Sequence, residues 1–213
     1  MAAVQMAPQS ALAHGNLALV YFFSGQTLEA ESEARLAIKV NPSSVAARCV
    51  LGQALLAQGD VDGATRMAAQ AVAFDPRLPQ ARYLLGVAYA EGRDFSHAAL
   101  ELEECLRLAP DFLPAASALA RVYTAMGRKE GAIKVLNNLL PEHRNTDAVL
   151  AALGMVYYQQ GNYEEAVGQY EKAVQLTPTS PLYRAELARL LIDANRLNAA
   201  ITQGQEATRL APE

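Results

Sequence analysis

The chain has 213 residues, of which 52% are hydrophobic and 19% charged, a balance that favours a folded protein over a disordered one. Its formal net charge of −4 gives it no basic excess to neutralise phosphates, so we expect no nucleic-acid partner. Two cysteines without a CxxC motif and three scattered histidines predict neither a disulfide framework nor a metal site.

No segment of the sequence suggests insertion into a membrane. The longest strongly apolar run, residues 17–23, is too short to cross a bilayer, and the first residues lack the basic start and apolar core of a signal peptide. Alanine and leucine are abundant, and both residues favour helices over strands. We therefore expect an all-α protein without membrane insertion.

Residues 1–10 open the chain with a pattern that returns later. The stretch AVQMAP is followed by AIKVNP, AVAFDP, CLRLAP, AVQLTP and ATRLAP. A chain that begins with the ending of its own repeat is typical of an excised array. We interpret residues 1–10 as the tail of a truncated preceding repeat, and the whole chain as a fragment of a longer protein.

The repeats have a period of 34 residues. Prolines mark this period, except at one place where Arg144 occupies the slot; they are Pro8, Pro42, Pro76, Pro110, Pro178 and Pro212. A leucine slot holds Leu17, Leu51, Leu85, Leu119, Leu153 and Leu187, and each leucine is followed by Gly or Ala. An alanine slot holds Ala30, Ala64, Ala98, Ala132, Ala166 and Ala200. Such self-similarity is the signature of a repeat architecture.

With these slots the whole chain resembles the tetratricopeptide repeat (TPR) family, whose period is 34 residues. The resemblance implies an all-α, right-handed superhelical solenoid of antiparallel helix pairs. The predicted TPR domain covers residues 11–213, with repeats at 11–44, 45–78, 79–112, 113–146, 147–180 and 181–213. One slot departs from the family pattern, because an aromatic is replaced by His14, Arg48, Arg82, Ala116, Leu150 and Arg184.

Each unit is predicted to form two helices. In the fifth unit, Gly161-Asn162 ends the first helix, because glycine accepts the left-handed backbone that a helix end needs. Gly154 and Ala166 are small where the two helices touch, so a larger side chain at either position should force them apart. The fourth unit meets Pro141 early, which predicts a shorter second helix and a more mobile loop.

In this family the first helices line the concave side of the superhelix. Helical phase predicts a groove-facing stripe that is more apolar than a solvated face, and such a surface usually marks an interface. The predicted partner-binding residues are Leu19, Phe22, Gln53, Tyr83, Val87, Arg121, Met155, Tyr158 and Arg189. The aromatic residues are expected to anchor a partner, and the two arginines to meet a carboxylate.

The resulting prediction is a protein–protein interaction scaffold that binds a peptide or partner helix. No nucleotide, hydrolase or kinase motif is present, so we expect no enzyme and no cofactor. Two alternatives remain: the TPR arm of a larger enzyme, and an envelope or secretion assembly factor. A homo-oligomer, formed through exposed array ends or the groove, is a further alternative. The excess of arginine over lysine hints at a bacterial source.

Two further predictions concern individual side chains. Glutamates gather on the second helices, at Glu29, Glu31 and Glu33 and again at Glu101, Glu103 and Glu104, and should form a solvated outer face. The two cysteines are expected to be buried free thiols that fill space.

Overall fold

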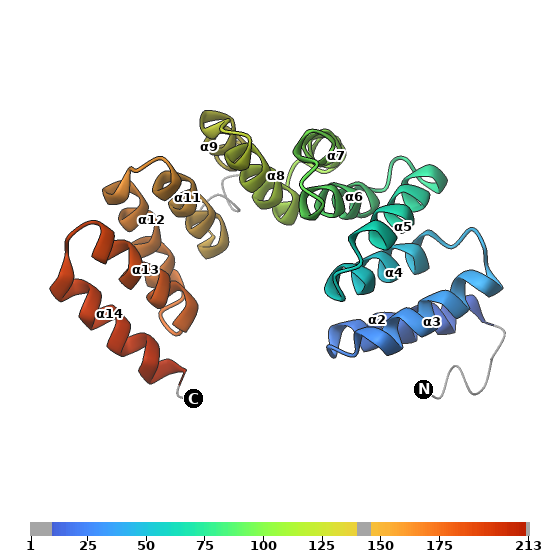
Figure 1. The fold of residues 1–213 in the computed structure, drawn as a ribbon. Coiled ribbons are helices and arrows are strands. Elements are labelled where there is room, and N and C mark those ends of the chain that lie inside the picture. Colours follow the sequence, from blue (N-terminus) through green and yellow to red (C-terminus); the bar gives the residue numbers. More distant parts are fainter. Residues whose placement is uncertain (1–9, 140–145, 212–213) are drawn as a thin grey trace. The chain divides into compact units, whose positions relative to one another are not determined.

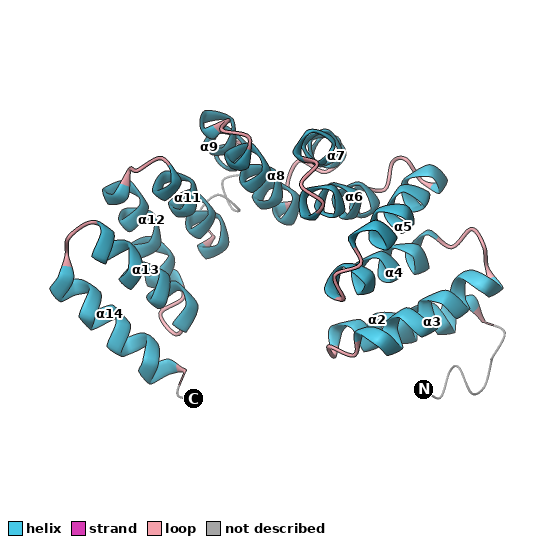
Figure 2. Ribbon diagram, viewed as in Figure 1, coloured by secondary structure: helices cyan, strands magenta, loops and turns pink. Residues whose placement is uncertain are grey.

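The computed structural model describes residues 10–139 and 146–211, and every regular element in these ranges is an α-helix (Figure 1, Figure 2). The predicted all-α fold is therefore confirmed. Of the predicted repeat tail at residues 1–10, the first nine residues lie outside the described ranges, as do residues 140–145 of the region where the more mobile loop is predicted.

The chain divides into two compact units, residues 1–110 and 111–213. In the first unit the helices are α2 (Ala11–Phe23), α3 (Thr27–Val40), α4 (Val45–Ala57), α5 (Val61–Phe74), α6 (Pro79–Glu91) and α7 (Phe95–Leu108). In the second unit they are α8 (Leu113–Ala125), α9 (Lys129–Asn137), α11 (Asp147–Gln159), α12 (Tyr163–Leu176), α13 (Pro181–Asp193) and α14 (Leu197–Leu210). Within each unit, consecutive helices pack as hairpins (Figure 1).

The turn inside each helix pair has a strict backbone requirement. One residue per pair has a positive φ, and these residues also recur every 34 positions: Gly25, Gly59, Arg93, Gly127, Gly161 and Asn195. Glycine adopts this left-handed conformation without strain, whereas a side chain disfavours it. The prediction for Gly161 is confirmed by its φ of 80°. Arg93 and Asn195 are the non-glycine members, with φ of 61° and 58°, and the arginine is the more strained because asparagine tolerates this conformation better.

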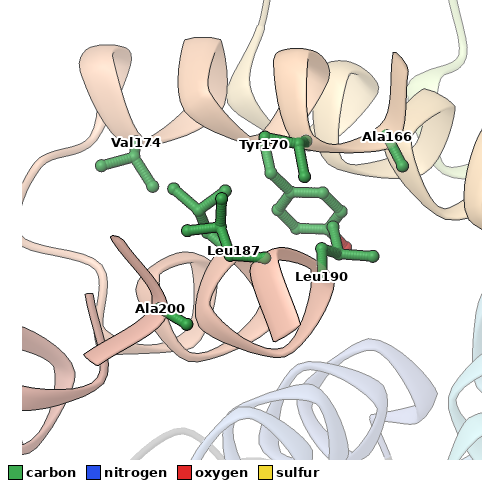
Figure 3. Close-up of a cluster of buried hydrophobic side chains, with 8 residues drawn as sticks. Ala166, Tyr170, Val174, Leu187, Leu190 and Ala200 are labelled. Carbon is green, nitrogen blue, oxygen red and sulfur yellow. The ribbon is translucent and has the colours of Figure 1, made fainter. Parts of the chain in front are cut away.

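Close contact between paired helices depends on the small residues that the repeat conserves. All six residues of the alanine slot are at most 5% exposed. A Cβ atom added to Gly154 would lie 2.6 Å from Cδ2 of Tyr170, so the tyrosine ring fills the space that glycine leaves. Figure 3 shows Tyr170 of α12 extending toward Leu187 and Leu190 of α13, which belong to the same buried cluster. The second helix of one repeat thus packs on the first helix of the next.

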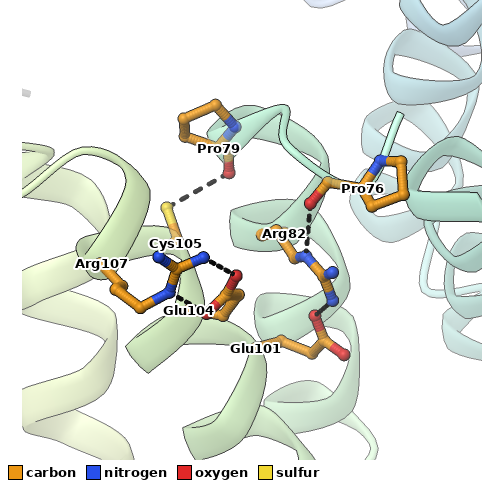
Figure 4. Close-up of polar contacts among 7 residues, drawn as sticks. All are labelled: Pro76, Pro79, Arg82, Glu101, Glu104, Cys105 and Arg107. Atoms are coloured by element: carbon orange, nitrogen blue, oxygen red, sulfur yellow. Dashed lines mark hydrogen bonds and ion pairs between the residues drawn. The ribbon is translucent and has the colours of Figure 1, made fainter.

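The slot that departs from the family pattern has a structural role that the sequence did not reveal. Nε of Arg82 donates a hydrogen bond to the carbonyl oxygen of Pro76 at 3.1 Å, and its Nη1 donates to Glu101 at 2.7 Å (Figure 4). Arg184 donates from Nε to the carbonyl oxygen of Pro178, and Arg48 donates from Nη2 to that of Pro42. Each arginine therefore joins the end of the preceding repeat to its own helix pair.

These contacts correct the prediction of a solvated acidic face. The side chains of Glu33 and Glu101 are only 19% and 20% exposed, because they pair with His14 and Arg82 across their helix pairs. The distance from His14 Nδ1 to Glu33 Oε2 is 2.6 Å. The prediction is wrong for these two residues, since the histidine and arginine that replace the family's aromatic bring a carboxylate inward.

The fourth helix pair is the irregular one. Its second helix, α9, has 9 residues, whereas the second helix of every other pair has 14. The prediction of a shorter second helix is confirmed. The period is maintained through this region, since α11 begins at Asp147, 34 residues after the start of α8 at Leu113.

Candidate functional site

The nine predicted partner-binding residues all lie on the first helices of their pairs. Leu19 and Phe22 are on α2, Gln53 is on α4, and Tyr83 and Val87 are on α6 of the first unit. Arg121 is on α8, Met155 and Tyr158 are on α11, and Arg189 is on α13 of the second unit. Each unit has a cavity on this side.

The first-unit cavity has a volume of about 480 Å³ and is formed by α2, α4 and α6. Four of the predicted residues line it together: Phe22, Gln53, Tyr83 and Val87. The helical phase missed Ala57, Leu84 and Glu91, which complete its wall along with Leu56. Leu19 is 38% exposed and does not contribute to the wall.

The second-unit cavity is larger, with a volume of about 690 Å³. Arg121 and Met155 are the predicted residues that line it. The rest of the wall comes from α8, α11, α12 and α13, and its members are Ser117, Ala120, Thr124, Ala125, Ala151, Ala152, Val156, Gln159, Tyr170, Leu182, Tyr183 and Glu186. Most of these side chains are apolar or small, as in known ligand pockets.

The larger volume follows from small residues at equivalent repeat positions. The slot that holds Tyr83 in the first unit holds Ser117 and Ala151 in the second. The next slot holds Leu84 in the first-unit wall and both Ala152 and Glu186 in the second-unit wall, so only the alanine leaves extra space. The backbone repeats from unit to unit, so serine and alanine at positions 117, 151 and 152 leave a larger space between the first helices than Tyr83 and Leu84 do. This space extends to Tyr170 on α12, which is 4% exposed.

Tyr158 and Arg189 contact each other beside this cavity and do not line it. The guanidinium carbon of Arg189 lies 4.4 Å from the centre of the Tyr158 ring. Its Nη2 donates to Oε2 of Glu186 at 2.8 Å. Burial opposes the charge of Arg189, but the hydrogen bond and the charge of Glu186 outweigh burial and raise its pKa. Arg189 is thus already paired with a carboxylate of its own chain.

Two phenols in the cavity wall keep their protons at neutral pH. Burial raises the pKa of Tyr170 to about 12, and the nearby charge of Glu186 acts in the same direction. Burial also raises the pKa of Tyr183, helped by the charge of Asp147 and the hydrogen bond with it. A protonated phenol can donate or accept a hydrogen bond but supplies no general base at physiological pH.

The two thiols are poor nucleophiles at neutral pH. Burial raises the pKa of both Cys49 and Cys105 to about 11, so both thiols are protonated at neutral pH. The prediction of burial holds for Cys105, but Cys49 is only partly buried. Across residues 10–139 and 146–211, no group of histidine, cysteine and carboxylate side chains is arranged to hold a metal ion.

The helices in the part of the chain that the structure describes are too short or too polar to span a membrane.

Comparison with protein families agrees with the repeat period. Models of the tetratricopeptide repeat match residues 16–79, 49–111 and 88–156, and a TPR repeat model matches residues 154–192. These matches overlap and together run from residue 16 to residue 192. The chain is a TPR protein. TPR domains are typically scaffolds for protein–protein interaction rather than enzymes.

Known proteins similar to this TPR chain differ widely in length. Anaphase-promoting complex subunit 3 of Schizosaccharomyces pombe is 22% identical over 176 residues, which are 83% of this chain and 26% of the yeast protein. The chain therefore spans about a quarter of that relative. A thermophilic TPR protein of Thermus thermophilus has a TM-score of 0.75 and 24% identity, with 86% of this chain and 100% of the other covered. YrrB, a TPR protein with an unusual peptide-binding site, has a TM-score of 0.61 and 16% identity, with 83% and 91% covered.

Proposed function

We propose that this TPR protein binds a peptide segment or a helix of a protein partner on its first helices, at the cavity that these helices form in each unit. The observation that carries the proposal is the presence of a cavity on the first helices of each unit, about 480 Å³ in one and 690 Å³ in the other. Both volumes fall within the usual range of about 300–1,000 Å³ for ligand pockets.

The composition of the two walls favours a peptide over a small polar metabolite. The walls combine apolar residues with aromatic side chains and few charges, as in interfaces that receive side chains of a partner. Phe22, Tyr83 and Met155 are the anchors that we assign to binding. YrrB, which shares this fold, has a peptide-binding site, and the yeast relative is a subunit of a larger complex.

The second candidate function is a regulatory or substrate-presenting arm within a larger protein. The yeast relative favours it, because this chain matches only 26% of its length. An enzyme domain and an envelope or secretion assembly factor both remain candidates for the larger protein. In either case the first-helix groove would be the surface that contacts the partner, so both candidates share the same binding experiment.

The test selects peptides from a displayed random library on the immobilised chain and measures their affinity by fluorescence anisotropy. We expect Val87→Glu in the first unit or Met155→Glu in the second to weaken binding at least tenfold, a loss of about 1.4 kcal/mol, because an acid would be buried in an apolar wall. The matched control is Leu100→Glu on second helix α7, at a leucine that is 61% exposed. This variant should bind as the wild type does.

The contrary results are equally specific. If the library yields no peptide that binds the chain, the proposal is wrong. If the peptides bind more weakly to Leu100→Glu and equally well to both groove variants, the binding surface lies on the second helices. Light scattering coupled to size exclusion, on the wild type and a Tyr83→Ser/Tyr158→Ser variant, checks whether the groove is occupied by a second copy instead.

A further inference from the structure

We propose that the second-unit cavity is selective for an acidic residue next to a bulky apolar residue within a partner segment, with Arg121 binding the carboxylate. This inference rests on the proposed function and specifies the chemistry of the ligand at one of the two cavities. It follows from the size of the cavity, from the side chains in its wall and from the balance of charge there.

The size of the cavity calls for more than one residue of a partner. Its 690 Å³ is comparable to pockets that enclose drug-sized molecules. The wall that would receive an apolar side chain consists largely of Ala120, Ala151, Ala152 and Met155. Alanines leave the volume open, and methionine adapts its shape because its side chain is unbranched and flexible. A short segment with one large apolar side chain fits this lining.

Two opposite charges line the cavity, but only one is available to a ligand. The carboxylate of Glu186 receives two hydrogen bonds from Arg189, at 3.0 and 2.8 Å. Arg189 therefore neutralises Glu186. Arg121 is exposed and forms no ion pair with any residue in the ranges 10–139 and 146–211. Among the described residues, the cavity thus offers one guanidinium without an ion pair, that of Arg121, beside an apolar wall.

The polar groups near Arg121 do not compete for its charge. Thr124, one turn further along α8, donates its hydroxyl hydrogen to the carbonyl oxygen of Ala120 at 2.6 Å. Tyr170 and Tyr183 carry raised pKa values and remain neutral. A guanidinium in this setting can bind a carboxylate through two parallel hydrogen bonds, and such charge-assisted bonds are about twice as strong as neutral ones.

The first-unit cavity provides an internal contrast. Its wall contains Gln53 and Glu91 but no lysine or arginine. An acidic ligand would gain nothing there and would meet the charge of Glu91. The preference for a carboxylate is therefore expected of the second unit alone, and the same chain contains a cavity that should lack it.

The experiment uses three short probes and the methyl signal of Met155 in the full chain, labelled with carbon-13 at methionine. The probes are N-acetyl-Glu-Phe-amide, the isosteric N-acetyl-Gln-Phe-amide, and N-acetyl-Glu-Ala-amide. We expect the Glu-Phe probe to shift the Met155 signal and to bind about three- to tenfold more tightly than the Gln-Phe probe. The Glu-Ala probe should bind more weakly than either, because it lacks the apolar anchor. Met67, in the core of the first unit, serves as the unaffected reference signal.

Two variants separate the charge from the cavity. Arg121→Gln should make the Glu-Phe and Gln-Phe probes bind equally while the Met155 signal still shifts. Ala151→Leu should reduce binding of both probes, since leucine fills the cavity, and Ser117→Leu does the same from α8 if the first variant is poorly folded. Circular dichroism confirms that each variant is helical.

Equal binding of the Glu-Phe and Gln-Phe probes to the wild type would overturn the inference, as would the absence of any Met155 shift. Tighter binding of N-acetyl-Gln-Phe with a free terminal carboxylate would overturn the assignment to an internal acidic residue. If the probes fail while library peptides remain sensitive to Met155→Glu, the proposed function stands and only the ligand chemistry is wrong. If the probes do not bind and library peptides are also insensitive to Met155→Glu, the second-unit cavity is not the binding surface.

Discussion

The substitution Gly154→Ala favours helix formation but crowds the contact between α11 and α12. Its effect on the free energy of unfolding shows which of the two is larger. Alanine in a helix is about 1 kcal/mol more favourable than glycine. At position 154, however, the new Cβ would lie 2.6 Å from Cδ2 of Tyr170 and 3.2 Å from the backbone oxygen of Ala166. Tyr170 is 4% exposed, so its ring must shift within the packed interior to admit the new Cβ, and overpacking of this kind costs about 1–3 kcal/mol. We expect a net loss of about 1 kcal/mol.

The matched control is Gly168→Ala on α12, where an added Cβ meets nothing within 4 Å. There the propensity gain is unopposed, so stability should rise by about 0.5–1 kcal/mol. Urea unfolding followed by circular dichroism measures both variants, and hydrogen exchange of α11 and α12 amides localises the effect, because repeat arrays can unfold in parts. A Gly154→Ala chain as stable as the wild type would refute the role of close helix contact at this slot.

Three further outcomes follow from individual residues. Arg93→Gly should raise the urea midpoint, because a φ of 61° strains arginine by about 1 kcal/mol and suits glycine; an unchanged midpoint would show that the turn is relaxed. Arg82→Met should lower stability by about 1–2 kcal/mol in the same assay, since it leaves Glu101 and a carbonyl without their partner, whereas Arg107→Met, in an exposed pair, should leave the midpoint unchanged. Cys49 and Cys105 should react with Ellman's reagent at pH 8 at least tenfold more slowly in the native chain than after unfolding, because a pKa of about 11 leaves little thiolate. The unfolded chain loses these thiol protons near the ordinary pKa of 9.0 while the folded chain keeps them, so stability should fall as pH rises from about 9 to about 11; rapid native labelling would contradict the burial.

The repeat itself could be predicted because each of its requirements is local or involves nearest neighbours. A positive φ at Gly161 needs only a residue without a Cβ. Ala166 must be small because it contacts the paired helix, and the same contact recurs in every unit. Six in-phase copies of these constraints are enough to identify helix pairs and their boundaries. The first-helix location of the candidate binding residues follows from the same periodicity together with the family resemblance.

The remaining features arise where side chains from different helices meet, and a one-dimensional pattern does not record such meetings. Arg82 and Glu101 are 19 residues apart, and only the packed hairpin brings their side chains to 2.7 Å. Glu186 neutralises Arg189 and so leaves Arg121 as the open charge of the second-unit cavity. The helical phase predicted that both arginines lie on the candidate binding face but could not distinguish them, because ion pairing depends on rotamers and on the distances between neighbouring side chains. The cavity exists because alanine and serine occupy positions where larger side chains would meet. Its volume is defined only when α8, α11, α12 and α13 are packed together.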